Sequence, residues 1–147
     1  MTDVADITTG VDFIVAGFVH EQFPLLLLAD QKGRISVRES FATVGEGEYP
    51  ASSVLIHRAH DELNSLGDAL YHVYEAKKYA ERVRSVGKAT SLMIVMPNNV
   101  TSLVTTEGRA FLDRRFEEFG PKAINPETFE MPAKYFSRDI SGEEQPS

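Results

Sequence analysis

The segment that most constrains the fold of this chain is residues 41–57, where a short apolar run meets two glycines and then a helical pattern. Gly45 and Gly47 stand one residue apart after that run. Glycine lets a backbone turn sharply or approach a neighbour closely, because it has no Cβ. Pro50 follows, and proline in the first turn of a helix costs no hydrogen bond and presets φ. The segment therefore predicts a strand over residues 41–44, a structural turn at the two glycines, and a helix.

Three strands are predicted upstream of the glycine turn. Residues 11–19 form a β-branched and aromatic run typical of a buried strand, and residues 23–30 form a second run rich in leucine. Residues 34–38 alternate polar and apolar side chains, which indicates a half-exposed strand. The turns at residues 20–22 and 31–33 are short, and short turns imply antiparallel pairing. We expect a three-stranded meander.

Two helices are predicted after the glycine turn. The first spans residues 50–60, where apolar side chains gather on one helical face. Ser65 stands three residues before Asp68, a spacing similar to a capping box that predicts the start of the second helix. Apolar residues then recur at three- and four-residue spacing as far as Val83. We therefore expect an amphipathic helix of about five turns that ends at a turn containing Gly87.

The sequence returns to a strand pattern after this helix. Residues 89–96 are typical of a strand, in which Met93 and Met96 are expected to fill the core. Residues 100–105 predict one more strand, and residues 106–120 predict another amphipathic helix. The predicted fold class is α/β (α+β), with largely antiparallel strands and two to three helices on one face.

Length and composition limit the domain organisation and the partners. The 147 residues are the length of one domain. We expect a flexible lead-in at residues 1–10, a single domain at residues 11–120, and a proline-containing C-terminal extension and tail at residues 121–147. There is no cysteine, which excludes disulfides, thiolate metal sites and a cysteine nucleophile. The net charge of −7 argues against a nucleic-acid partner. The chain shows neither a long apolar run nor a signal peptide, so we expect no membrane partner and a cytoplasmic protein.

The joints between the predicted elements have a specific order. Apolar runs form a hairpin around residues 26–33, the glycine turn leads into a helix, Leu-Gly-Asp-Ala-Leu stands at residues 66–70, and Ser-Val-Gly stands at residues 85–87 before a strand. Over residues 12–104 this order resembles the second half of a proteasome-type N-terminal-nucleophile (Ntn) hydrolase subunit. That family includes the proteasome α and β chains and the bacterial HslV peptidase. The resemblance implies half of an αββα sandwich, with Gly45, Gly47 and Gly87 as structural turn residues.

The resemblance also indicates where catalytic residues would stand. Family members carry a threonine nucleophile at a free N-terminus and a lysine that lowers its pKa, in the half of the fold that this chain does not match. Ser85 matches a supporting serine, but Glu46 stands where the family has a serine and Arg82 where it has an aspartate. A second alignment makes Thr8 or Thr9 the nucleophile after processing. We expect a chain without its own nucleophile, and its catalytic candidates are Thr8, Thr9 and Ser85.

Two further groups of residues are candidates for metal binding or for subunit contacts. His57 and His60 lie three apart on a predicted helix, next to Asp61, but the spacing fixes no third metal ligand, so neither a metal site nor a cofactor is predicted. Lys78 and Arg82 lie on a basic helix face, and the resemblance makes them candidate subunit contacts.

Three functions remain open from the sequence. The first is a subunit or partial subunit of a threonine-peptidase-like assembly. If such a subunit is active, it is an N-terminal threonine hydrolase that acts on polypeptides as part of an oligomer. The second is a non-catalytic binding or assembly module on the same scaffold. The third is an unrelated small α/β enzyme that uses His57, His60 or carboxylates. Because half a sandwich leaves a sheet face uncovered, we expect a homo-oligomer or a partner subunit that completes it.

Overall fold

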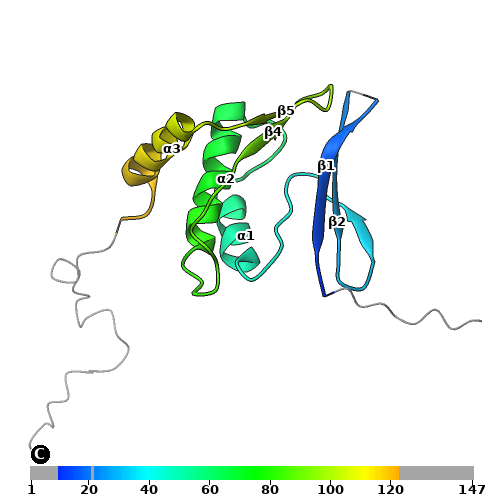
Figure 1. Ribbon diagram of the computed structural model, residues 1–147, viewed down its shortest axis with the longest axis horizontal. Coiled ribbons are helices and arrows are strands. Elements are labelled where there is room, and N and C mark those ends of the chain that lie inside the picture. Colours follow the sequence, from blue (N-terminus) through cyan, green and yellow to red (C-terminus); the bar gives the residue numbers. More distant parts are fainter. Residues whose placement is uncertain (1–9, 21, 123–147) are drawn as a thin grey trace, which may run out of the picture.

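The computed structural model describes residues 10–20 and 22–122 of the chain. These residues form five strands and three helices in the order β1-β2-β3-α1-α2-β4-β5-α3 (Figure 1). The strands belong to two antiparallel sheets, so the predicted mixed α+β fold class with antiparallel strands is confirmed. The expected lead-in and the C-terminal extension lie outside the described residues, apart from residue 10 and residues 121–122.

The first three strands form a meander, as predicted. We call it sheet A, and its spatial order is β1 (Phe13–Val19), β2 (Phe23–Ala29) and β3 (Ile35–Val37). Phe13 lies opposite Ala29 in the first pair of strands, and Leu27 lies opposite Val37 in the second. Asp30 closes the turn after β2, because its carboxylate accepts hydrogen bonds from two backbone N–H groups of that turn.

The strand predicted over residues 41–44 is wrong. A strand needs a neighbour for its backbone hydrogen bonds, and no strand in the described part of the chain pairs with these four residues. They form the connection into the first helix instead. Phe41 packs against the helical core, and the hydroxyl of Thr43 is hydrogen-bonded to that of Ser52. The side chains of this connection, rather than its backbone, hold it in place.

The glycine turn leads into α1 (Glu48–His57), which begins two residues earlier than predicted. Gly45 has a φ of 89°, a conformation that residues with a Cβ rarely adopt. Gly47 is buried at the N-cap, and a Cβ placed on it would lie 2.6 Å from the Cβ of Ala80. Gly45 is therefore required by its backbone conformation, and Gly47 by the close approach of Ala80.

The second helix, α2 (Leu66–Ala80), starts as predicted and ends earlier. The Ser65 side chain accepts a hydrogen bond from the backbone N–H of Asp68 at 3.1 Å, which confirms the predicted cap. The prediction that the helix runs past Val83 is wrong. Tight turns that include the Val83 N–H to Ala80 C=O bond occupy residues 81–86 before the chain reaches Gly87. These turns satisfy carbonyls that the end of the helix leaves free.

A short hairpin and the third helix complete the described fold: β4 (Met93–Val95), β5 (Thr101–Leu103) and α3 (Thr106–Phe119). Thr105 caps α3 by accepting a hydrogen bond from the backbone N–H of Gly108. The prediction that Met93 and Met96 fill the core is wrong, because they keep 58% and 38% of their surface exposed. The preceding Leu92 is the buried residue of this segment.

The hairpin turn connects the two sheets through one side chain. Asn99 Oδ1 accepts a hydrogen bond from the Phe18 N–H at 2.9 Å, and Asn99 Nδ2 donates to the Phe18 carbonyl at 3.1 Å. Both backbone groups of Phe18 point away from β2, as they do at every second residue of an antiparallel pair, and this position tolerates the opposite Pro24, which has no N–H. Asn99 therefore occupies the free edge of β1.

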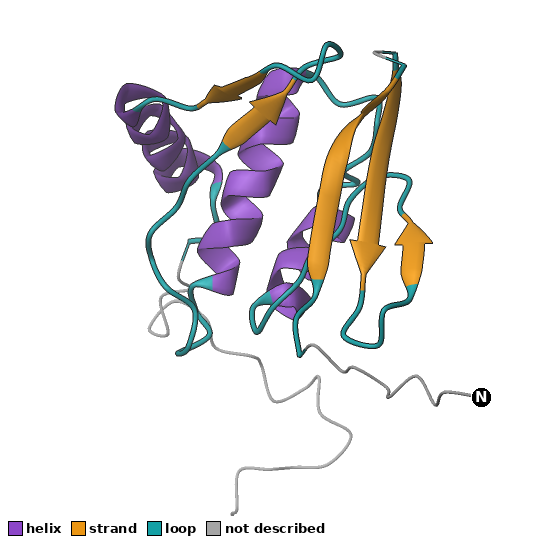
Figure 2. Ribbon diagram, turned by 45° about the vertical axis from the view of Figure 1, so that its right-hand side comes forward, coloured by secondary structure: helices purple, strands orange, loops and turns teal. Residues whose placement is uncertain are grey.

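The buried core is small and lies between helices. Val54, Leu55 and Ala76 join α1 to α2, while Tyr74 and Leu112 join α2 to α3 in a second cluster with Leu92. Figure 2 shows the helices on one side of sheet A, and none of the described elements on its other side. Within the described residues, no helix combines the length and apolar character needed to cross a membrane.

Candidate functional site

Sheet A has two faces with different surroundings. Successive strand residues point to opposite faces, and residues paired across antiparallel strands share a face. Ile14, Ala16 and Leu26 belong to the inner face, which lines a cavity against α1 and α2. We call the opposite face the outer face, and its residues are Phe13, Val15, Gly17, Val19, Phe23, Leu25, Leu27, Ala29, Ile35 and Val37.

The outer face is apolar and open to solvent. Phe23, Ile35 and Val37 keep 63%, 69% and 68% of their surface exposed, and Phe13 and Val15 keep 53% and 55%. The face contains no charged side chain and no side-chain hydrogen-bonding group. Contiguous apolar patches larger than a few hundred Å² are rare on monomers and mark interaction sites. The outer face is therefore the strongest candidate functional surface in the described part of the chain.

The inner face borders a cavity of about 710 Å³. Most of its lining is apolar, and His60 and Lys77 are among its polar side chains. Lys77 Nζ is held by the Glu81 carboxylate at 2.9 Å and by the Gly87 carbonyl at 2.6 Å. His60 contacts His72. Both side chains therefore already have partners within the chain.

The structure separates the two histidines that the sequence places three apart. His57 is exposed at the end of α1, whereas His60 Nδ1 lies 3.3 Å from Nδ1 of His72 on α2. Burial lowers the pKa of His60 below its ordinary value of 6.5, and the neighbouring His72 lowers it further, while Asp61 opposes this. No group of three metal-ligating side chains occurs among residues 10–20 and 22–122. The His60–His72 pair joins the turn after α1 to α2.

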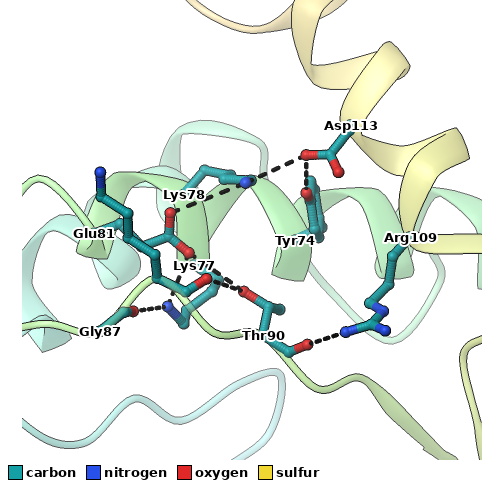
Figure 3. Close-up of polar contacts among 9 residues, drawn as sticks. Tyr74, Lys77, Lys78, Glu81, Gly87, Thr90, Arg109 and Asp113 are labelled. Atoms are coloured by element: carbon teal, nitrogen blue, oxygen red, sulfur yellow. Dashed lines mark hydrogen bonds and ion pairs between the residues drawn. The ribbon is translucent and has the colours of Figure 1, made fainter. Parts of the chain in front are cut away.

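A polar network joins α2 to α3 (Figure 3). Tyr74 donates a hydrogen bond to the Asp113 carboxylate, and Lys78 Nζ lies 3.2 Å from the same carboxylate. The hydrogen bond from Tyr74 lowers the pKa of Asp113, and Lys78 reinforces this. Arg109 donates to the Thr90 carbonyl at 3.0 Å, which fixes the loop before β4 onto α3. The network orients the helices and the loop relative to one another.

The candidate subunit contacts differ in how far they are engaged. Lys78 forms ion pairs with Asp113 and Glu81 and lies over the Tyr74 ring at 5.3 Å. Arg82 is exposed, and its guanidinium lies 4.3 Å from the Tyr79 ring centroid. A charge change at Lys78 would therefore disturb the contact between α2 and α3, whereas Arg82 is accessible from solvent.

The catalytic candidates are not brought together by the described structure. Ser85 is exposed in the turns after α2, while Thr8 and Thr9 lie outside the described residues. Glu46 is exposed between the two turn glycines. Gly87 lies beyond the end of α2, where its carbonyl accepts the Lys77 bond.

Sequence reasoning missed the most buried charged contact. Glu75 keeps only 3% of its surface exposed, and Arg58 donates to its two carboxylate oxygens at 2.7 Å and 2.9 Å. The hydrogen bonds to Glu75 raise the pKa of Arg58. His72 stands three residues before Glu75 on the same helix, but Glu75 is paired with Arg58. No local signal marked this pair, because Glu75 stands outside the apolar spacing of α2 and its partner comes from the end of another helix.

Comparisons with known proteins add no relative to this picture: no protein-family model matches the chain, and no curated protein matches its sequence. Functional inference for this chain therefore depends on its own residues and on the order of its elements.

Proposed function

We propose that this chain is a proteasome-like, Ntn-hydrolase-type subunit, or part of one, that contributes a scaffold to a threonine-peptidase-like assembly without supplying the nucleophile itself. The outer face of sheet A carries this proposal. In a sandwich of two sheets, each sheet is apolar on the side that meets its partner, and in an αββα sandwich helices cover its other side. Sheet A has an exposed apolar face on one side and helices on the other.

The polar contacts of the described residues support a scaffold role. An N-terminal-nucleophile site needs a base and a cation placed beside the nucleophile. The hydroxyls of Ser65 and Thr105 instead cap helices, and the hydroxyl of Thr43 pairs with that of Ser52. Ser85 lies exposed on a turn. These hydroxyl groups are engaged in structural contacts or face solvent, so a polypeptide substrate would be cleaved by residues elsewhere in the assembly.

The outer face supports the second reading equally, a non-catalytic binding or assembly module on the same scaffold. Glu46 and Arg82 favour this alternative, because they stand where the resembled family has a supporting serine and an aspartate. The two readings differ in whether the assembly that contains the chain cleaves peptides, and both require the outer face to be covered.

The deciding experiment isolates the protein from its own source and weighs the intact assembly and its released subunits by native mass spectrometry. The assembly is then treated with a threonine-directed covalent reagent. We expect a defined assembly whose label is carried by a threonine of another chain, whereas a label on Thr8 or Thr9 would mean that this chain supplies the nucleophile. An assembly that takes up no label would favour the non-catalytic module. A chain that is monomeric in its source would contradict both readings.

A further inference from the structure

We infer that the outer face of sheet A is covered by the outer face of a second copy of this chain. Two copies would then form a two-sheet sandwich with helices on both outer sides. The inference rests on the proposed function and names the partner that the scaffold takes.

The chemistry of the outer face suits a copy of itself. Its side chains carry neither charge nor hydrogen-bonding groups, so a charged or polar partner would lose hydration there without gaining a replacement. An identical face avoids that loss. The chain has a net charge of −7, yet the adjacent β2–β3 turn contains Asp30, Lys32 and Arg34, and Arg34 lies 2.6 Å from Asp30. Contact through the outer face therefore brings from this turn only the charge of Lys32 on each copy.

The exposed area is close to what a dimer needs. The six most exposed side chains of the outer face contribute on the order of 600 Å² of apolar surface, against about 800 Å² per partner in a standard protein interface. These side chains are Phe13, Val15, Val19, Phe23, Ile35 and Val37. The half-buried Leu25 and Leu27 lie between them and make the patch continuous. A two-fold interface uses the same patch on both copies, so this one patch suffices.

The edges of sheet A are less suited to association than its face. Asn99 already occupies both backbone groups of Phe18 at the free edge of β1. β3, at the opposite edge, is only three residues long. Face-to-face packing needs neither edge, because sheets pack about 10 Å apart through their side chains.

The described course of the chain also favours a second copy over the chain's own C-terminal segment. α3 lies on the far side of α1 and α2 from sheet A in both views (Figures 1 and 2). Residues 120–122, which follow it, therefore leave the described structure away from the outer face.

The first test measures the mass of the purified full-length chain in solution across a range of concentrations. We expect a dimer of twice 16.3 kDa that dissociates on dilution. Val37→Asp should weaken the dimer at least about tenfold, because it places a charge in an apolar interface. Ile56→Asp on α1 is the matched control, since Ile56 and Val37 are both 68% exposed. Circular dichroism checks that both variants fold. If Val37→Asp does not fold, the milder Val37→Thr takes its place.

The second test uses the absence of native cysteine, which makes an introduced thiol the only one in the protein. Val37→Cys and Ile56→Cys are each treated with a thiol reagent at low and at high protein concentration. We expect the reaction of the Val37→Cys thiol to slow at least about tenfold at high concentration, as the dimer forms. The Ile56→Cys thiol should react at the same rate throughout.

Any other outcome overturns the inferred dimer. The outcomes also show whether the proposed scaffold function fails with it. A Val37→Cys thiol that is protected at every concentration means that the same chain covers its own outer face. A dimer that Val37→Asp leaves intact means that the interface lies elsewhere. If the purified chain is monomeric but its source contains an assembly with a different chain, the second copy is wrong and the proposed scaffold function stands. If it is monomeric in both, both proposals fail.

Discussion

Arg58 and Glu75 stand 17 positions apart, and the guanidinium of one holds both carboxylate oxygens of the other. Arg58 is the C-cap of α1, and Glu75 lies in the middle of α2. The pair therefore fixes the end of one helix against the next, and it does so with a carboxylate that is almost fully removed from water.

Arg58→Met should lower the free energy of unfolding by about 3 kcal/mol, because it leaves Glu75 buried and unpaired. This is the low end for buried ion pairs, since 32% of the Arg58 side chain remains exposed and water can partly replace it. The double variant Arg58→Met/Glu75→Leu should recover most of the loss, because apolar side chains then fill the site. Urea unfolding of both single variants and the double variant measures this. A loss below about 1 kcal/mol for Arg58→Met would mean that the pair behaves as an exposed one.

Asn99→Asp should lower the free energy of unfolding by about 1–2 kcal/mol, because a carboxylate cannot donate to the Phe18 carbonyl that it would face. Asn98→Asp is the matched control in the same turn. Asn98 Oδ1 only accepts, from the Val100 N–H, so a carboxylate can replace it without losing that bond. Thermal unfolding of the two variants side by side checks the difference. Equal effects would mean that the Asn99 contact contributes nothing specific.

Ala59→Gly should raise the free energy of unfolding by about 0.5–1 kcal/mol. Ala59 has a φ of 49° just after α1, where the His60 N–H bonds the Leu55 carbonyl and completes a helix-ending motif that favours glycine. Ala69→Gly in α2 is the opposite control, since glycine inside a helix should cost a similar amount. Chemical denaturation of both variants should show shifts of opposite sign, and a destabilised Ala59→Gly would contradict the strain at this position.

The free energy of unfolding should fall as the pH is lowered through 6.5, the ordinary pKa of histidine. The pKa of His60 is lowered in the folded chain, so the unfolded chain binds a proton more readily. The stability from neutral His60 is therefore fully present above pH 6.5 and is lost as the pH falls through the lowered folded value. His60→Gln should flatten this dependence between about pH 7.5 and about pH 5.5. Denaturation curves across this range would contradict the assignment if the His60→Gln variant kept the slope of the native chain.

Local sequence signals predicted much of this fold. The meander followed from short turns between β-rich runs, and the start of α2 followed from Ser65, since a capping side chain and its target N–H are three residues apart. The prediction of a strand at residues 41–44 failed because an apolar run does not specify whether a neighbouring strand will be present. The predicted end of α2 was wrong because the helical spacing of apolar residues continues to Val83, although the helix itself ends at Ala80.

The candidate surface was harder to predict than the strands that form it. β1 is apolar on both faces, and this pattern led to the expectation of a buried strand. The described fold supplies a cover for the inner face only, so exposure of the outer face depends on which elements exist rather than on the strand itself. The pairing of Glu75 with Arg58 was likewise invisible, because it depends on how α1 lies against α2.

In sheet A and among the helices, each strand or helix packs mainly against the next one of its kind: β1 with β2, β2 with β3, α1 with α2, and α2 with α3. Such an arrangement permits opening in separate cooperative units. The strands of the meander contain no buried residue, whereas α2 contains four, so the amide hydrogens of the meander should exchange with solvent before those of α2. Covering the outer face would reverse that order, and amide exchange along β1 would then report whether the chain is alone or assembled.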